Sequence, residues 1–201
     1  MILYIFAPQD LPSEYILNLR RWAKEVGFPD LYLVANMAAT NEHYTIYTKD
    51  RIYDAVSFQR LGPSLHKGSS YYDLIIRGLQ RRWLDMRSSI FNKPARLWNY
   101  KKFYKNFVGE EDYNEDVIPT IVPQWDHTPR SGVNGSLFVE ATPDNFYRHC
   151  KDVLRVVQSK NNQLIFLKSW NEWGEGNMME PDLTYGRGFI NALRKAINEL
   201  T

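Results

Sequence analysis

The sequence has 201 residues, of which 44% are hydrophobic and 24% are charged, values typical of a soluble globular protein with one buried core. A net charge of +2 is too small to indicate a nucleic-acid partner, and the single cysteine excludes an internal disulfide. No apolar run approaches the ~20 residues that a membrane-spanning helix needs.

Short apolar runs alternate with amphipathic segments along the chain, which predicts strands alternating with helices. Residues 95–100 fit either a strand or the start of a helix, so both alternatives stay open there. In chain order the other predicted elements are a strand at 2–6, a helix at 15–26, a strand at 31–35, a strand at 55–58, a helix at 72–86, a strand at 117–122, a helix at 142–158, a strand at 164–167 and a helix at 185–200.

Local signals support several of these elements. The run at 2–6 is short and continuous, as in a buried parallel strand, and Gly27 stands where a helix C-cap is expected. Thr142 and Pro143 form a helix start, and Pro119 weakens the strand at 117–122. Cys150 shares the spacing of the apolar helix positions around it, which favours a packed thiol over a nucleophile.

The alternation predicts an α/β fold with a parallel sheet and helical crossovers, in a single domain over residues 1–201. We count about five strands, whereas a complete (β/α)8 barrel has eight strands and ~250 residues. The sheet is therefore either open or an incomplete TIM-type barrel. In both cases a ligand is expected at the carboxyl ends of the strands, where the long polar loops follow residues 35, 122 and 167, the first of them with His43, Tyr44 and Tyr47.

The densest polar cluster directly follows the last predicted strand. Glu172 and Glu175 lie three residues apart in it, so their Cβ atoms are about 5 to 6 Å apart in a helical turn. Retaining glycosidases hold two carboxyl groups about 5 to 5.5 Å apart, one of which keeps a proton while the other stays ionised. Flanking Trp170 and Trp173 offer faces on which a sugar can stack. The simpler alternative is an acidic first helical turn, favoured by the helix dipole.

The sequence Asn171-Glu172-Trp173-Gly174-Glu175-Gly176 with Glu180-Pro181-Asp182 resembles the closing motif of the WbsX-type glycosyltransferase proteins, which are similar to glycoside hydrolase family 99. The stretch Pro123 to Arg130 is similar to a second segment of that family, with His127 where Asn is expected. The order of the N-terminal elements also follows the family, so the resemblance covers most of the chain.

The resemblance implies a (β/α)8 barrel of which this chain carries about the last five β/α units. It also implies that Glu172 acts as base on the sugar's own 2-hydroxyl and Glu175 as acid on the leaving oxygen. The substrate would be carbohydrate or a sugar phosphate in polysaccharide or lipopolysaccharide O-antigen metabolism, and the enzyme a glycosyltransferase or a glycoside hydrolase. Expected substrate-binding residues are Trp125, Asp126, Arg130, Trp170, Asn171, Trp173 and Glu180.

Two alternatives remain beside an active enzyme. An incomplete barrel would expose an unpaired strand, so the chain is either a catalytically impaired glycan-binding fragment or one chain of a barrel completed by self-association or by a second chain. For Trp125 and Asp126, the alternative to substrate contact is a packed ring and an aspartate that caps a turn.

Other sequence features give only weak evidence for a metal, a cofactor or a further partner. His127 and His149 have no partner at metal-ligand spacing, and no phosphate-binding glycine motif occurs, so we expect no metal and no cofactor. Residues 77–105 hold nine basic residues and one acidic residue, Asp85, which fits a solvated face or, alternatively, a surface for phosphate or an anionic membrane. The N-terminus has no signal-peptide pattern, so the sequence predicts a cytoplasmic protein.

Overall fold

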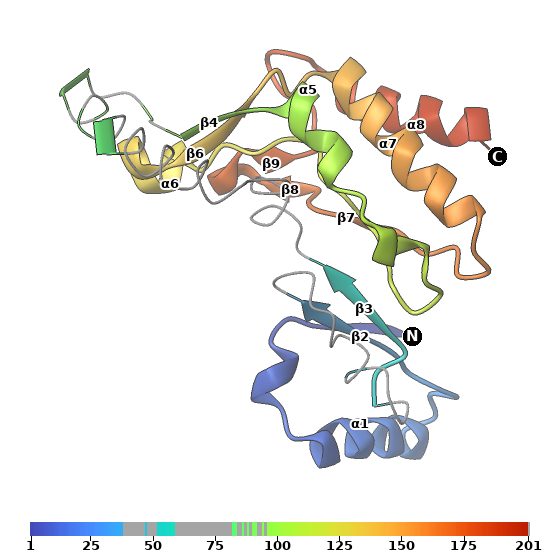
Figure 1. Cartoon of the computed structure of the whole chain (residues 1–201). Coiled ribbons are helices and arrows are strands. Elements are labelled where there is room, and N and C mark those ends of the chain that lie inside the picture. Colours follow the sequence, from blue (N-terminus) through green and yellow to red (C-terminus); the bar gives the residue numbers. More distant parts are fainter. Residues whose placement is uncertain are drawn as a thin grey trace.

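The structure is a computed structural model that describes residues 1–37, 52–58 and 96–200, with positions 47, 82, 83, 86, 88, 90, 91 and 94 between them (Figure 1). The predicted polar loop with His43 and Tyr44 and most of the predicted helix at 72–86 lie outside the described residues. Of the basic residues between 77 and 105, the described ones are exposed, which fits a solvated face: Arg82, Arg96, Lys101, Lys102 and Lys105.

The five segments for which only a strand was predicted do form strands, and these strands run parallel. β1 (Ile2–Ile5), β2 (Tyr32–Met37) and β3 (Ala55–Phe58) form one sheet in that order, and β5 (Thr120–Ile121) pairs with β7 (Phe166–Leu167). A parallel bridge joins Val56 of β3 to Val117, just before β5. The strands therefore follow one another in space in their chain order.

Three of these strands, β1, β5 and β7, are shorter than predicted, and β1 is also more exposed. β5 is interrupted at Pro119, which has no N–H to donate, although its carbonyl still accepts from the Phe166 N–H at 3.0 Å. The prediction that residues 2–6 form a buried strand is wrong, because β1 pairs only with β2 in the described part of the chain. Ile2 and Phe6 are accordingly 48% and 71% exposed.

A second parallel pair consists of β4 (Arg96–Asn99) and β6 (Ser136–Val139). Both alternatives for residues 95–100 are realised, since α5 (Tyr100–Phe103) begins directly after β4 with Asn99 as its N-cap. The Asn99 side chain accepts from the Lys102 N–H at 3.2 Å. β6 was not predicted, because four residues after a glycine-rich turn are too few to establish a period.

The long helices cover the sheet as their apolar stripes predict (Figure 1). α1 (Ser13–Glu25) buries Ile16 and Ala23, and Gly27, two residues after its end, has a φ of +92°. α7 (Pro143–Gln158) begins as predicted, with the Thr142 hydroxyl accepting from Asn145 N–H at 3.3 Å. The short helical segments are η1 (Pro8–Asp10), η3 (Tyr104–Asn106), η4 (Glu110–Tyr113), α6 (Thr128–Ser131), η5 (Gly132–Asn134) and η6 (Trp173–Glu175).

The last helix, α8 (Gly188–Leu200), starts three residues later than predicted. The Asp182 carboxylate accepts from the backbone N–H groups of Thr184 and Tyr185 and holds them in a turn, and Gly186 then has a φ of +52°. This turn competes with a helical first turn, so Tyr185 lies before the helix. α7 and α8 pack together around a core that includes Phe146, Cys150 and Phe189, which confirms the packed thiol. Burial raises the pKa of Cys150.

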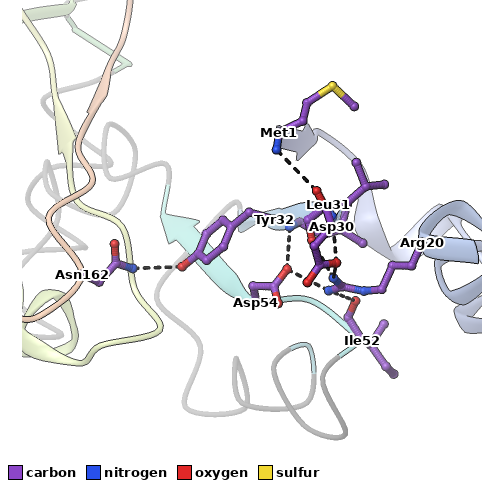
Figure 2. A network of polar contacts seen from close by, with 9 residues as sticks. Met1, Arg20, Asp30, Leu31, Tyr32, Ile52, Asp54 and Asn162 are labelled. Atoms are coloured by element: carbon purple, nitrogen blue, oxygen red, sulfur yellow. Dashed lines mark hydrogen bonds and ion pairs between the residues drawn. The ribbon is translucent and has the colours of Figure 1, made fainter. Parts of the chain in front are cut away.

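Arg20 ties the amino ends of the strands together, at the opposite edge from the long loops (Figure 2). Its guanidinium donates to Leu31 O at 2.6 Å and pairs with the Asp54 carboxylate at 2.8 Å. The same carboxylate oxygen accepts from the Leu33 N–H at 2.7 Å. One arginine on α1 therefore fixes β2 against the turn that leads into β3.

We expect Arg20→Met to lower the free energy of unfolding by about 2 kcal/mol, because the half-buried Asp54 loses its counter-charge and Leu31 O loses a donor. Arg21→Met is the matched control, since Arg21 is exposed and only approaches Glu25 at 3.7 Å. It should change stability by less than about 0.5 kcal/mol. Urea unfolding followed by circular dichroism measures both, and equal effects would contradict this role for Arg20.

Within the described residues, no helix is long and apolar enough to cross a membrane.

Candidate active site

The predicted catalytic pair lies in a loop that leaves β7 and returns to α8. We call residues 169–180 the glutamate loop. It contains a small antiparallel hairpin of β8 (Asn171–Glu172) and β9 (Asn177–Met178), with η6 at its tip. Two-residue strands carry no readable period, so the sequence did not predict the hairpin.

Gly176 lets the hairpin close against the loop that follows β5. It has a left-handed φ of +50°, and a Cβ at this position would lie 2.6 Å from the Cβ of Asp126. On the same side the Asp126 N–H donates to Glu175 O at 2.8 Å. The glycine is therefore required twice, for its backbone conformation and for the close approach of Asp126.

Side-chain hydrogen bonds hold the glutamate loop together and join it to the segment after β5. Ser169 Oγ accepts from the Glu172 N–H at 3.2 Å and donates to Asn177 O. The buried Asn177 side chain donates to Gln124 O, and Gln124 Nε2 donates to Met178 O at 3.2 Å. This reciprocal pair joins the end of β5 to the hairpin, and so sets the position of Glu172 and Glu175 relative to the β5 loop.

Both glutamates contact one arginine. Arg130 Nη1 donates to Glu175 Oε1 at 2.7 Å, and Arg130 Nη2 lies 3.4 Å from Glu172 Oε1. The Glu172 side chain is 46% exposed and the Glu175 side chain only 18%, so the two carboxylates have different access to water. The structure thus brings Glu172 and Glu175 together with Arg130, which lies 42 and 45 positions earlier in the chain.

Trp125 and His127 line the side of this site next to Glu175. Their rings stack in parallel with centroids 5.9 Å apart, and His127 Nε2 lies 3.7 Å from Glu175 Oε1. The Trp125 ring also contacts Lys168, whose ammonium lies 5.6 Å from the centre of the ring. The indole thus contacts both a neighbouring ring and a cation, and it is partly buried against the core.

Asp126 makes contacts that fit the turn-capping alternative. Its Oδ1 accepts from the Thr128 N–H at 2.9 Å and from the Thr128 hydroxyl at 2.6 Å, which starts α6. Through α6 this turn carries Arg130 to the glutamates. Asp126 therefore stabilises the turn that positions Arg130, and this role does not depend on contact with a ligand.

The remaining predicted residues lie on the exposed side of the glutamate loop. Trp170 and Trp173 are each 49% exposed, and Asn171 is exposed in β8. The Trp173 indole N–H donates to Glu180 Oε2 at 2.6 Å, which fixes the ring plane. Two large aromatic faces are thus available to a ligand beside the carboxylates.

Two buried side chains that the sequence did not indicate as part of the site hold the end of β5. His149 Nε2 accepts from the Val122 N–H at 3.1 Å, and the Tyr100 hydroxyl donates to Val122 O at 2.6 Å. Both groups come from helices rather than from motif segments, so only the helical spacing of His149 with Cys150 and Val153 hinted at its burial. Burial lowers the pKa of His149 to about 3.

This histidine makes stability depend on pH. Because its pKa is about 3 in the folded chain and about 6.5 in the unfolded chain, the unfolded chain binds the proton more readily between these values. The contribution is fully present above pH ~6.5 and is lost as the pH falls, by about 3 kcal/mol between pH 7 and pH 4. In His149→Gln, whose amide oxygen can still accept from Val122, the acid-induced loss measured by urea unfolding should shrink by that amount; an unchanged pH profile would contradict it.

No group of three or more His, Cys, Asp or Glu side chains that could hold a metal ion occurs among the residues that the structure describes.

Comparison with known proteins agrees with the motif. A sequence model of the family described as Glycosyltransferase WbsX matches residues 1–193. Two proteins named "Uncharacterized protein WxcX", from two strains of Xanthomonas campestris pv. campestris, are each 34% identical over 205 residues. The match covers 98% of this chain and 26% of each relative, so the chain spans about a quarter of the length of these curated relatives.

Proposed function

Because the chain belongs to the Glycosyltransferase WbsX family, we propose that it is a carbohydrate-active enzyme of polysaccharide metabolism in which Glu172 and Glu175 act on a glycosidic bond. The observation that carries this proposal is the convergence of both carboxylates on Arg130, at the carboxyl end of a parallel strand. The exposed rings of Trp170 and Trp173 support it, since sugars bind through aromatic faces beside such carboxylates.

The proposed reaction has two halves. In the first, Glu172 takes the proton of the sugar's 2-hydroxyl as the 2-oxygen forms a bond to the anomeric carbon. At the same time the bond between the anomeric carbon and the leaving oxygen breaks, and Glu175 gives its proton to that oxygen. In the second, water or another sugar's hydroxyl attacks the anomeric carbon and the bond to the 2-oxygen breaks. Glu172 returns its proton to the 2-oxygen, and Glu175 takes a proton from the nucleophile. Two inversions give overall retention, and hydrolase and transferase differ only in the second nucleophile.

We also propose that the parallel strands are part of a (β/α)8 barrel, of which this chain carries about the last five β/α units. The order β1, β2, β3, β5, β7, with helices returning the chain, supports the proposal. So does the position of the glutamate loop at the carboxyl end of β7, since barrel enzymes carry their active sites at that end.

The test is product analysis. The pure chain is incubated with neutral and acidic oligosaccharides, once in buffer alone and once with an isotopically labelled sugar as acceptor. New reducing ends in buffer identify a hydrolase, and label in a longer product identifies a transferase. If glycans bind and neither product forms, the acid–base proposal fails for this chain.

One observation favours glycan binding without turnover as a second candidate. The Arg130 guanidinium lies between the two carboxylates, in the space where the reacting atoms of a sugar would have to lie. An enzyme must displace this group when substrate binds, whereas a binding module need not. A crystal structure with a bound oligosaccharide distinguishes the two, because in the enzyme Arg130 leaves at least one glutamate.

A further inference from the structure

A cavity of about 350 Å³ opens at the carboxyl ends of β1, β3, β5 and β7. Its walls are aromatic, with Tyr4, Phe58, Phe107 and Phe166 among them, and neither Glu172 nor Glu175 lines it. This volume lies at the lower end of the range for small-molecule sites, which suits a single sugar ring rather than a long chain.

The polar groups of this cavity differ in whether protein partners already occupy them. Thr120 Oγ1 is bonded to Ser57 Oγ at 3.1 Å, and Ser169 Oγ bonds Asn177 O and the Glu172 N–H. Lys168 is different: across residues 1–37, 52–58 and 96–200, no carboxylate lies within 4 Å of its ammonium. A cation in a mostly apolar wall is stabilised by an anionic partner, which here the ligand would supply.

The cavity adjoins the glutamate loop through Ser169, whose hydroxyl accepts from the Glu172 N–H at 3.2 Å. Lys168 also lies over the Trp125 ring, which in turn stacks on His127 beside Glu175. A ring in the cavity would therefore lie next to the segment that carries the two glutamates. Arg130, the nearby guanidinium, is already paired with them and leaves Lys168 to bind an anion.

We propose that this cavity is the subsite for a sugar ring that carries an anionic substituent, a carboxylate or a phosphate, and that Lys168 binds that substituent. The proposal rests on the proposed function and names its substrate class. The aromatic walls contact the ring faces, and the substituent pairs with the ammonium at the edge of the cavity. Selectivity for acidic over neutral glycans follows from this one cation.

The experiment is a binding titration of the whole chain by NMR with matched ligands. Methyl glycosides of glucuronic, galacturonic and mannuronic acid are compared with the neutral methyl glucoside, galactoside and mannoside, and the 6-phosphates of the neutral sugars form a third set. We expect at least one acidic ligand to bind about tenfold or more tightly than its neutral counterpart, and added salt to reduce the difference. The first and third sets separate a carboxylate from a phosphate.

Lys168→Met should abolish the preference for acidic ligands, and Lys168→Arg should retain it. Lys101→Met is the matched control, since Lys101 is an exposed lysine of α5, and it should leave the preference unchanged. Equal binding of acidic and neutral sugars, a preference that survives Lys168→Met, or no binding by any ligand would each overturn the proposal. The readout is independent of turnover, so substitution of Glu172 or Glu175 by Gln should leave the preference in place. Loss of the acid–base proposal and loss of this subsite are therefore distinguishable.

Discussion

Glu175→Gln and Glu172→Gln should each reduce turnover by about 10²- to 10⁴-fold, the usual range for removal of a general acid or base, while leaving the fold intact. The amide has the shape of the carboxyl group but neither gives nor takes the proton. Both side chains are at the tip of a hairpin and outside the core clusters, so circular dichroism and the urea midpoint should change little.

The two variants are expected to differ in their dependence on the leaving group. On an activated aryl glycoside the leaving oxygen needs no proton, so Glu175→Gln should recover much of its rate, whereas Glu172→Gln should stay impaired. Glu25→Gln removes the same charge from the exposed surface of α1 and serves as the control. If both glutamate variants keep wild-type rates on natural glycans, neither residue is catalytic; reversed leaving-group behaviour would exchange their roles.

The long helices and five of the parallel strands were predictable because each shows its own period or a clear boundary. Thr142 and Pro143 mark the start of α7, and Gly27 marks the end of α1, since each residue type is favoured there by backbone geometry. The boundary of α8 was not predictable in this way. The turn around Asp182 depends on competition between side-chain and helical hydrogen bonds, which a period cannot weigh.

The sequence indicated that the motif and the end of β5 lie near each other, but it did not indicate the contacts between them. The motif and the end of β5 were expected on the same edge of the sheet, and Asp126 indeed bonds Glu175 through the backbone. That both glutamates would share Arg130 depends on α6, a helix of four residues that no pattern indicated. Lys168 and His149 were missed because their roles come from burial and from neighbours distant in sequence.

Arg130 also changes how the pair of glutamates is understood. The two-carboxylate logic considers like charges that repel, but here a guanidinium lies between them and neutralises part of that repulsion. Its side chain is 54% exposed and is carried on α6, whose position depends on the Asp126 turn. In the proposed enzyme, substrate binding and the position of the β5 loop would be coupled through Arg130 and Asp126.

Gly176→Ala tests that coupling and should have the second-largest effect. The new Cβ would be 2.6 Å from Asp126 Cβ and 3.0 Å from Asp126 N, so the β5 loop must move. Left-handed strain and overpacking together should lower the free energy of unfolding by about 3 kcal/mol. A shift of the glutamates relative to Arg130 by about 1 Å should lower turnover by about a hundredfold.

Gly186→Ala is the matched control for this substitution. Gly186 has a φ of +52°, close to that of Gly176, but a Cβ there would meet nothing within 4 Å. It should therefore show only the conformational strain, about 1 kcal/mol, with turnover and ligand binding unchanged. Urea unfolding and the rate on one glycan, measured for both variants, separate backbone strain from displacement of the site. If the two variants lose equal stability and both keep full turnover, the contact between Gly176 and Asp126 does not position the glutamates.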